Sequence, residues 1–411
     1  MEGPSLEKRT NNEGPYRKST LVEKVRQSKR IAFLDVDSTL TVNPDIAHRI
    51  RERLEEQGCA VVFVTSRTEE MQMSEEDLRA TDPQELKRPP PHLRKTAEGS
   101  YEYADPKTLP EHSPFVEGDA IAGTTGTRLF IKQESGGYKL DTEFEESMVQ
   151  ESATWRDGVF ELLEYVDPEH TVTIAPIDVA ENFEHNQVDV YPPNYRVQLG
   201  FSAKERPHET AGSTGKRSVV SEESGKQLLV QKNLFTEKID DVKNDPNTPA
   251  HIREIVSNVR ITDDSNPMKG MYQLYITPHQ GYKARAVEHI IKNIVSETGI
   301  YRNDLKVIIA GDSYPDVAMG LYGALSTEAT FVVAGGSRLS AVFTEPQIHE
   351  FAAEEFTAIK KRLSGDFEKG ILEFKQPMHG SRKIIIGDKV FPGMKAPESI
   401  LAALDTIFEK E

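Results

Sequence analysis

The sequence predicts an α/β fold in which a parallel-sheet core is interrupted by an inserted domain. Short apolar runs that suit buried strands alternate with amphipathic helices near both ends of the chain. A more polar segment of mixed character lies between these two regions. The length of 411 residues suits two domains better than one, because ordinary domains hold roughly 100–200 residues.

The first half of the expected core is a strand–helix–strand unit. Residues 30–35 (RIAFLD) and 60–64 (AVVFV) are short apolar runs typical of buried parallel strands. The stretch between them has apolar residues four positions apart, as one face of a helix does. Pro44 suits the first turn of that helix and Gly58 its C-terminal cap. This order predicts a βαβ unit.

The second half of the core is expected after residue 280. Residues 283–298 carry an apolar helical stripe that ends before Gly299. Further strands are predicted at 305–310, 331–334 and 383–386, with a last helix over 397–409.

The middle of the chain is less regular. Strands are predicted at 119–123, 128–132, 195–201 and 271–277, and helices at 154–165 and 248–259. Polar stretches at 69–114, 203–246 and 338–380 are expected to be insertions, and their composition predicts a flexible segment over 203–246. Residues 1–28 are expected to form a flexible N-terminal tail.

Composition and charge restrict the classes of partner. The formal net charge of -17 makes nucleic acid a poor default partner, although a metal ion can reverse the sign locally for a small phosphorylated substrate. No apolar run is long enough to span a membrane, and the N-terminus lacks an apolar signal-peptide centre. Cys59 is the single cysteine, which excludes an internal disulfide. Together these features predict a cytoplasmic protein with no membrane partner.

Polar residues follow three of the predicted strands, at the points where the strands end. They are Asp35 and Asp37, Thr65 with Ser66 and Arg67, and Asp312 with Ser313 and Asp316. Ligands of open α/β sheets bind at the carboxyl ends of the strands. If the three strands are parallel neighbours, these side chains converge in one crevice.

The chemistry that suits these residue types is metal-assisted phosphoryl transfer. Clustered carboxylates without Cys or His favour a hard cation such as Mg²⁺. A carboxylate can attack phosphorus once cations neutralise the phosphate. A second carboxylate can protonate the leaving oxygen and then deprotonate the attacking water. A threonine hydroxyl and a lysine ammonium can bind phosphoryl oxygens.

Four short motifs resemble those of the haloacid dehalogenase superfamily, and they occur in its order. Asp35-Val-Asp37-Ser-Thr39 resembles motif I, D-x-D-x-T, and Thr65-Ser-Arg resembles motif II in its T-G-R variant. Lys283 resembles the lysine of motif III, and Gly311-Asp312-Ser-Tyr-Pro-Asp316 resembles motif IV, G-D-S-x-N-D. The segment 119–131 and the final helix look most like those of sucrose-phosphate phosphatases.

The resemblance implies a role for each matching residue. Asp35 would be the nucleophile and a metal ligand, and Asp37 the acid/base, with its carbonyl on the metal. Thr65, Ser66 and Lys283 would bind phosphate. Asp312 would bind Mg²⁺, with Asp316 supporting the metal site. By this resemblance the substrate would be a small phosphorylated compound, a sugar or polyol phosphate.

The resemblance also implies the domain boundaries. The core would comprise residues 29–135, including the polar excursion, and residues 277–411. Residues 136–276 would form an α+β cap of type IIB.

Several departures from the family pattern leave alternatives open. Ser66 replaces a glycine, Pro315 replaces an asparagine, and Lys283 lacks its usual following glycine, which makes Arg285 a fallback. Ser313 could cap a helix or touch the metal. A phosphomutase on the same fold is the first alternative function, and a catalytically silent binding protein is the second.

Overall fold

The computed structural model describes residues 14–66, 72–82, 85, 93–95, 101–103, 117–152, 155–168, 173–174, 197–200, 222–263, 273–320, 328–344, 363–366, 368–374 and 382–409.

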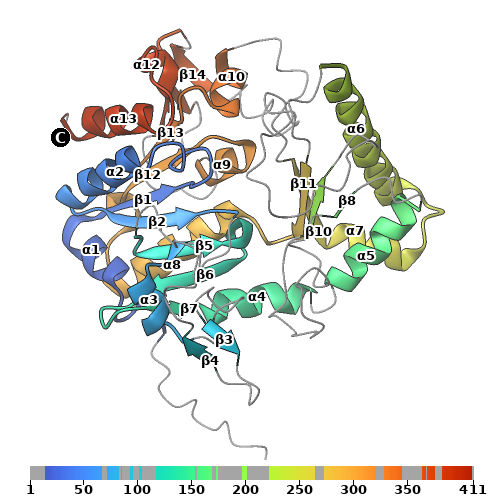
Figure 1. Ribbon diagram of the computed structural model, residues 1–411, viewed down its shortest axis with the longest axis horizontal. Coiled ribbons are helices and arrows are strands. Elements are labelled where there is room, and N and C mark those ends of the chain that lie inside the picture. The colour runs from blue at the N-terminus through green and yellow to red at the C-terminus, as the bar shows by residue number, and fades with distance from the viewer. Residues whose placement is uncertain are drawn as a thin grey trace, which may run out of the picture.

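A ten-stranded sheet forms the centre of the molecule, in the order β14-β15-β16-β13-β12-β1-β2-β5-β6-β7 (Figure 1). The neighbours from β16 to β5 run parallel, and the two strands at each edge run antiparallel. The strands are β1 (Arg30–Leu34), β2 (Ala60–Val64), β5 (Ala120–Gly123), β6 (Arg128–Lys132), β7 (Tyr138–Leu140), β12 (Lys306–Gly311), β13 (Glu328–Val333), β14 (Leu363–Asp366), β15 (Ile371–Phe374) and β16 (Arg382–Ile386). The predicted α/β fold class is confirmed.

Helices cover both faces of this sheet because alternate strand residues point to opposite sides. In β1, Ile31 and Phe33 belong to one buried cluster, whereas Ala32 and Leu34 belong to the other. The helices α1 (Thr20–Ser28) and α8 (Lys283–Thr298) contribute to the first cluster. The helices α2 (Pro44–Glu56) and α13 (Glu398–Glu409) contribute to the second (Figure 1).

Local sequence signals explain where the core helices begin and end. Asn43 caps α2, since its side chain accepts a hydrogen bond from the backbone N–H of Ile46 at 3.4 Å, and Pro44 occupies the first turn. At the other end of the core, α8 stops at Gly299, whose φ of 70° is left-handed. Both helices lie where the apolar spacing predicts them.

A second, four-stranded antiparallel sheet lies apart from the first, with three helices beside it (Figure 1). Helices α6 and α7 contribute buried Phe235, Ile239, Ile252 and Val256 to its core. Its elements are β8 (Thr173–Ile174), β9 (Val197–Gly200), β10 (Val259–Asp263), β11 (Gln273–Pro278), α5 (Trp155–Val166), α6 (Glu222–Asn244) and α7 (Ala250–Ser257).

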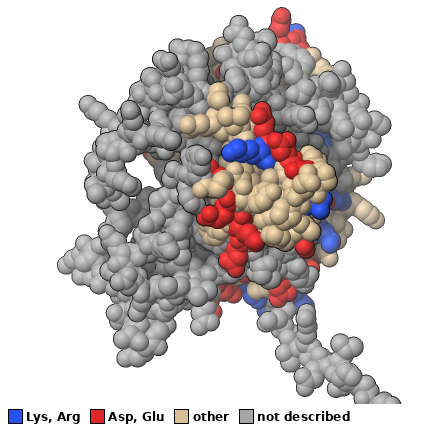
Figure 2. All heavy atoms as spheres, turned by 90° about the vertical axis from the view of Figure 1, so that its right-hand side faces the viewer, with Lys and Arg blue, Asp and Glu red and all other residues tan. Residues whose placement is uncertain are grey.

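The four-stranded sheet and its helices lie on the side of the molecule that faces the viewer in Figure 2, where acidic side chains lie beside uncharged ones. The exposed apolar residues of α6 include Val230 and Leu234.

Shorter elements complete the described chain. They are α3 (Glu75–Ala80), β3 (Leu93–Lys95), β4 (Tyr101–Tyr103), η3 (Thr124–Gly126), α4 (Thr142–Ser152), η7 (Arg302–Asp304), α9 (Tyr314–Ala318), α10 (Arg338–Thr344) and α12 (Gly387–Val390). No helix within the described ranges is both long and apolar enough to cross a membrane.

Three sequence predictions are wrong in part. Residues 20–28 are not a flexible tail but the helix α1, which buries Leu21, Val22 and Val25 against the sheet. The expected flexible insertion at 203–246 contains the 23-residue helix α6. The insertion at 338–380 includes β14 and β15, which extend the sheet. In each case burial against distant parts of the chain stabilises an element whose local sequence is polar. Within the predicted excursion at 69–114, the structure describes only residues 72–82, 85, 93–95 and 101–103.

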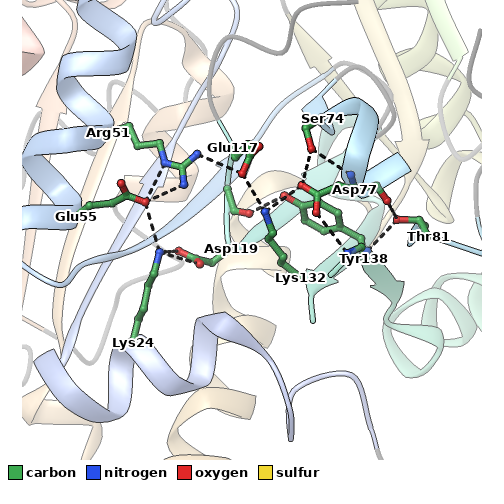
Figure 3. A network of polar contacts seen from close by, with 12 residues as sticks. Lys24, Arg51, Glu55, Ser74, Asp77, Thr81, Glu117, Asp119, Lys132 and Tyr138 are labelled. Carbon is green, nitrogen blue, oxygen red and sulfur yellow. Dashed lines mark hydrogen bonds and ion pairs between the residues drawn. The ribbon is translucent and has the colours of Figure 1, made fainter. Parts of the chain in front are cut away.

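A polar network ties the start of β5 to the neighbouring helices (Figure 3). The Asp119 carboxylate accepts hydrogen bonds from Lys24 of α1 at 3.0 Å and from the backbone N–H of Val61 at 2.9 Å. Lys132 of β6 contacts Asp77 of α3 at 2.9 Å and Glu117 at 3.0 Å. These ion pairs connect α1 to the start of β5 and α3 to β6, although the buried residues of the two helices belong to different clusters.

Candidate functional site

The carboxyl ends of three adjacent parallel strands bring the predicted site residues together. Strand β1 lies between β12 and β2, and Asp35 follows β1 directly. The backbone N–H of Asp35 donates to the carbonyl of Ala310 on β12 at 2.9 Å. Thr65 follows β2, and Asp312 follows β12. The parallel register therefore places Asp35 between the other two strand ends.

Asp35 is buried, with 3% of its surface exposed, and both carboxylate oxygens have protein partners. Lys283 Nζ donates to Oδ1 at 2.7 Å, and the Thr39 hydroxyl donates to Oδ2 at 3.1 Å. Thr39 lies in the turn that follows β1, so the local D-x-D-x-T spacing returns its hydroxyl to the first aspartate. These contacts fix the orientation of the Asp35 carboxylate.

Lys283 is the first residue of α8 and is also buried. Its Nζ contacts Asp35 Oδ1 and Asp316 Oδ1, each at 2.7 Å. An ammonium group has three N–H donors, so these two contacts leave a third that can serve a phosphoryl oxygen. The missing glycine after Lys283 does not prevent its side chain from reaching Asp35.

Asp316 organises the loop that follows β12. Its Oδ2 accepts hydrogen bonds from the backbone N–H groups of Asp312 and Ser313, both at 3.0 Å, and from the Ser313 hydroxyl at 2.9 Å. Ser313 is the N-cap residue of α9, and Pro315 fits within the first turn of that helix. Gly311 has no room for a side chain, because a Cβ there would overlap the Asp316 carboxylate.

Burial and like charge dominate the electrostatics of this cluster. Desolvation raises the pKa of Asp35 well above its ordinary value, the carboxylates of Asp316 and Asp312 raise it further, and Lys283 opposes the shift. For Lys283, burial lowers the pKa, but the attraction of Asp316 and Asp35 exceeds that effect and raises it. Burial thus disfavours the ionised form of Asp35, whereas the two carboxylates favour the ammonium form of Lys283.

The residues around Asp35 fit a hard divalent cation. Asp35, Asp312 and Asp316 can each offer a carboxylate oxygen, and these oxygens lie within 4.8 Å of one another. Oxygen ligands are those that Mg²⁺ prefers. Lys283 alone cannot balance three buried carboxylates, and buried charge without compensation is costly. A cation at this position would favour the ionised form of Asp35.

The remaining predicted residues follow the ends of β1 and β2. Asp37 and Ser66 are half-buried, Asp37 in the turn after β1 and Ser66 next to Thr65. Thr65 itself is buried. Arg67 lies outside the described residues.

The sequence predicts a turn between the strands at 119–123 and 128–132, but not that this turn, η3, lies beside Thr65. The backbone N–H of Thr125 donates to the carbonyl of Thr65 at 2.9 Å. Gly126 packs against the start of α8, where a Cβ would lie 2.8 Å from Lys283 Cα. The turn thus contacts two predicted phosphate ligands. Its one sequence signal is a Gly between threonines after a strand, which is too common to indicate a site.

Comparisons with known proteins give matches only among solved structures. No protein-family model matches the chain, and no curated protein matches its sequence. A sucrose-phosphatase from a Synechocystis species, solved with sucrose and phosphate, is 11% identical over 93% of this chain and 98% of its own, with a TM-score of 0.42. A haloacid dehalogenase-like hydrolase protein from Bacillus subtilis is 12% identical over 92% of each chain, with a TM-score of 0.35.

An IMP-nucleotidase from Plasmodium falciparum is 11% identical over 74% of this chain and 63% of its own, with a TM-score of 0.34. At such identities and scores these likenesses assign no activity, so the side chains at the strand ends carry the functional conclusion. The solved structures that match this chain thus include haloacid dehalogenase-like hydrolases and a sucrose-phosphatase.

Proposed function

We propose that this protein is a Mg²⁺-dependent phosphatase that hydrolyses a phosphate monoester through a phosphoryl intermediate on Asp35. One observation carries the proposal. The buried carboxylate of Asp35 contacts Lys283 at 2.7 Å and forms a cluster of oxygen ligands with Asp312 and Asp316, close to the ends of parallel strands. A carboxylate held beside an ammonium and a candidate cation site is suited to attack a phosphate group.

Asp35 would act as the nucleophile. Its carboxylate oxygen attacks phosphorus, and an acyl phosphate forms as the ester oxygen leaves. Asp37 donates a proton to that leaving oxygen, and then accepts a proton from the water that attacks the acyl phosphate. Inorganic phosphate leaves and the Asp35 carboxylate is restored.

The other site residues would orient the substrate. Thr65, Ser66 and the third N–H of Lys283 bind phosphoryl oxygens, and Lys283 with Thr39 aligns Asp35. When bound, Mg²⁺ supplies positive charge that neutralises the phosphoryl group. Its ligands would be Asp35, the Asp37 carbonyl, Asp312 and Asp316, of which Asp316 also positions Lys283 and the β12 loop.

The substrate we propose is a soluble sugar or polyol phosphate. The resemblance of residues 119–131 and of the last helix to sucrose-phosphate phosphatases supports this choice. The part that holds β8 to β11 and α5 to α7 would serve as the cap over the site and exclude bulk water. The sequence-based boundary at residue 136 is too early, because β7 (Tyr138–Leu140) belongs to the central sheet. We propose that the cap begins after Leu140 and ends near residue 276.

The test is phosphate release from a panel of sugar and polyol phosphates, with and without Mg²⁺. Wild type, Asp35→Asn and the matched control Asp45→Asn are compared, since Asp45 is an exposed residue in the first turn of α2. We expect Mg²⁺-dependent release from wild type and from the control, and none from Asp35→Asn.

Two outcomes would contradict the proposal. A folded wild-type protein that releases phosphate from no monoester would exclude the hydrolase. An isomerised phosphate ester without net phosphate release would identify a phosphomutase instead.

A further inference from the structure

The turn between β5 and β6 holds a polar group that the proposed reaction does not yet use. Thr125 is 3% exposed, and its Oγ1 has no hydrogen-bond partner within the described part of the chain. A buried hydroxyl without a partner costs free energy that a bound ligand can recover. Such a group in a folded protein therefore indicates a missing partner.

Thr125 lies between two of the proposed phosphate ligands. Its backbone N–H donates to the Thr65 carbonyl at 2.9 Å, and the Thr65 N–H donates to Ala122 at 2.9 Å. The next residue, Gly126, sits against the backbone of Lys283 so closely that a Cβ would lie 2.8 Å from Lys283 Cα. The Thr125 backbone is thus fixed relative to both Thr65 and the start of α8.

The backbone of this turn is strained. Thr124 and Thr125 have φ values of 49° and 64°, in the left-handed region that β-branched residues rarely adopt. Glycine or asparagine would adopt it at lower cost. Strain of this kind is found at functional sites, where it holds a side chain in a required position.

We propose that Thr125 is an additional ligand of the substrate, whose hydroxyl donates a hydrogen bond to a phosphoryl oxygen between Thr65 and Lys283. This inference rests on the proposed function, because it requires a phosphate group in front of Asp35. The neighbouring Thr127 hydroxyl has a different role, since it already donates to the Thr124 carbonyl at 2.7 Å and stabilises the turn.

The experiment measures binding of inorganic phosphate by calorimetry in the presence of Mg²⁺, together with thermal unfolding without phosphate. Thr125→Val removes the hydroxyl but keeps the shape and the β-branching, so the backbone strain is unchanged. We expect its Kd for phosphate to rise about tenfold, as for loss of a hydrogen bond to a charged group. Its unfolding midpoint should not fall, because the buried hydroxyl had no partner. Thr125→Ser should restore most of the affinity.

Thr127→Val is the matched control. It should lower the unfolding midpoint, because it loses a 2.7 Å hydrogen bond, while phosphate affinity is kept. Wild-type phosphate affinity in Thr125→Val would overturn the inference. Equal losses of affinity in Thr125→Val and Thr127→Val would also overturn it, because the geometry of the turn would then account for the effect. Failure of the wild type to bind phosphate would overturn the proposed function and this inference with it.

Discussion

At the scale of single residues, the contact between Lys283 and two buried carboxylates dominates the site. Lys283→Met would leave Asp35 and Asp316 buried without their ammonium partner. Breaking a buried ion pair from one side costs about 3–5 kcal/mol. We expect urea unfolding of the metal-free protein to show a loss of this size, and phosphate release to be abolished.

The double variant Lys283→Met with Asp35→Asn separates charge from packing. Because the second substitution removes one of the uncompensated carboxylates, the two losses of unfolding free energy should be less than additive. Lys369→Met is the control, since that lysine is exposed and its pair with Asp366 lies at the surface. Strict additivity in the double variant would show that the Lys283–Asp35 contact is not the source of the loss.

At the scale of elements, the close approach of η3 to α8 is the most sensitive packing contact. Gly126→Ala would place a Cβ 2.8 Å from Lys283 Cα and 3.0 Å from Lys283 N at a φ of 79°. Because the obstructing atoms are backbone, the turn or α8 must shift. We expect a loss of about 2–4 kcal/mol in unfolding free energy and a fall in phosphate release.

Gly299→Ala is the matched control for this prediction. Gly299 also has a left-handed φ, 70°, but no atom of the described residues lies within 4 Å of its expected Cβ. Gly299→Ala should lose only about 1–2 kcal/mol of unfolding free energy, the cost of a left-handed backbone at a residue with a side chain, and should keep its activity. Equal activity in the two variants would contradict the view that η3 positions Lys283.

The ion pairs of Lys132 make the anchoring of α3 dependent on pH (Figure 3). Burial lowers the pKa of Lys132, but its hydrogen bonds to Asp77 and Glu117 outweigh burial and raise it above the ordinary 10.5. A raised pKa in the folded state gives stability that is complete below 10.5 and is lost as pH rises through the folded value. Lys132→Met should therefore lose about 1–2 kcal/mol at pH 7.

Denaturant unfolding at pH 7 and at a series of pH values above 10.5 measures this effect. The difference in unfolding free energy between wild type and Lys132→Met should shrink at the higher pH, because the wild-type ammonium loses its proton. A difference that stays constant across this range would mean that packing of the lysine stem, not its charge, holds α3.

The elements that the sequence predicts correctly are those whose buried residues form a regular apolar pattern within the element itself. The strands β1, β2 and β12 are uninterrupted apolar runs, and α8 has a full apolar stripe with a glycine after it. Helices α1 and α6 were missed, because their apolar residues are few and diluted by charge. Their stability comes from packing on surfaces that only the folded chain provides.

The part of the candidate site that lies at the strand ends could be predicted from the sequence, and the contacts between packed elements could not. The approach of Asp35 and Asp312 follows from parallel neighbouring strands, and the register of β1 with β12 agrees with it. The contact of Lys283 with Asp316 and the position of Thr125 depend on how α8 and η3 pack, which no local pattern encodes.

At the scale of the whole molecule, the excess of buried negative charge links metal binding to folding. A cation that binds only the native state stabilises it by roughly 2.7 kcal/mol at 100 times its Kd. We expect Mg²⁺ to raise the unfolding midpoint of wild type, and a chelator to reverse this. Asp312→Asn should lose most of the shift, whereas the exposed control Asp45→Asn should keep it. An equal shift in both variants would place the cation elsewhere.

The proposed reaction transfers the phosphoryl group of the substrate to the Asp35 carboxylate. The measurement that tests it most directly is acid quenching of wild type within the first turnover of its best monoester, followed by mass spectrometry of its peptides. We predict a phosphoryl group on Asp35, and none in the same peptide of Asp35→Asn. Phosphate release with no modified peptide, or with the phosphoryl group on another residue, would contradict the account.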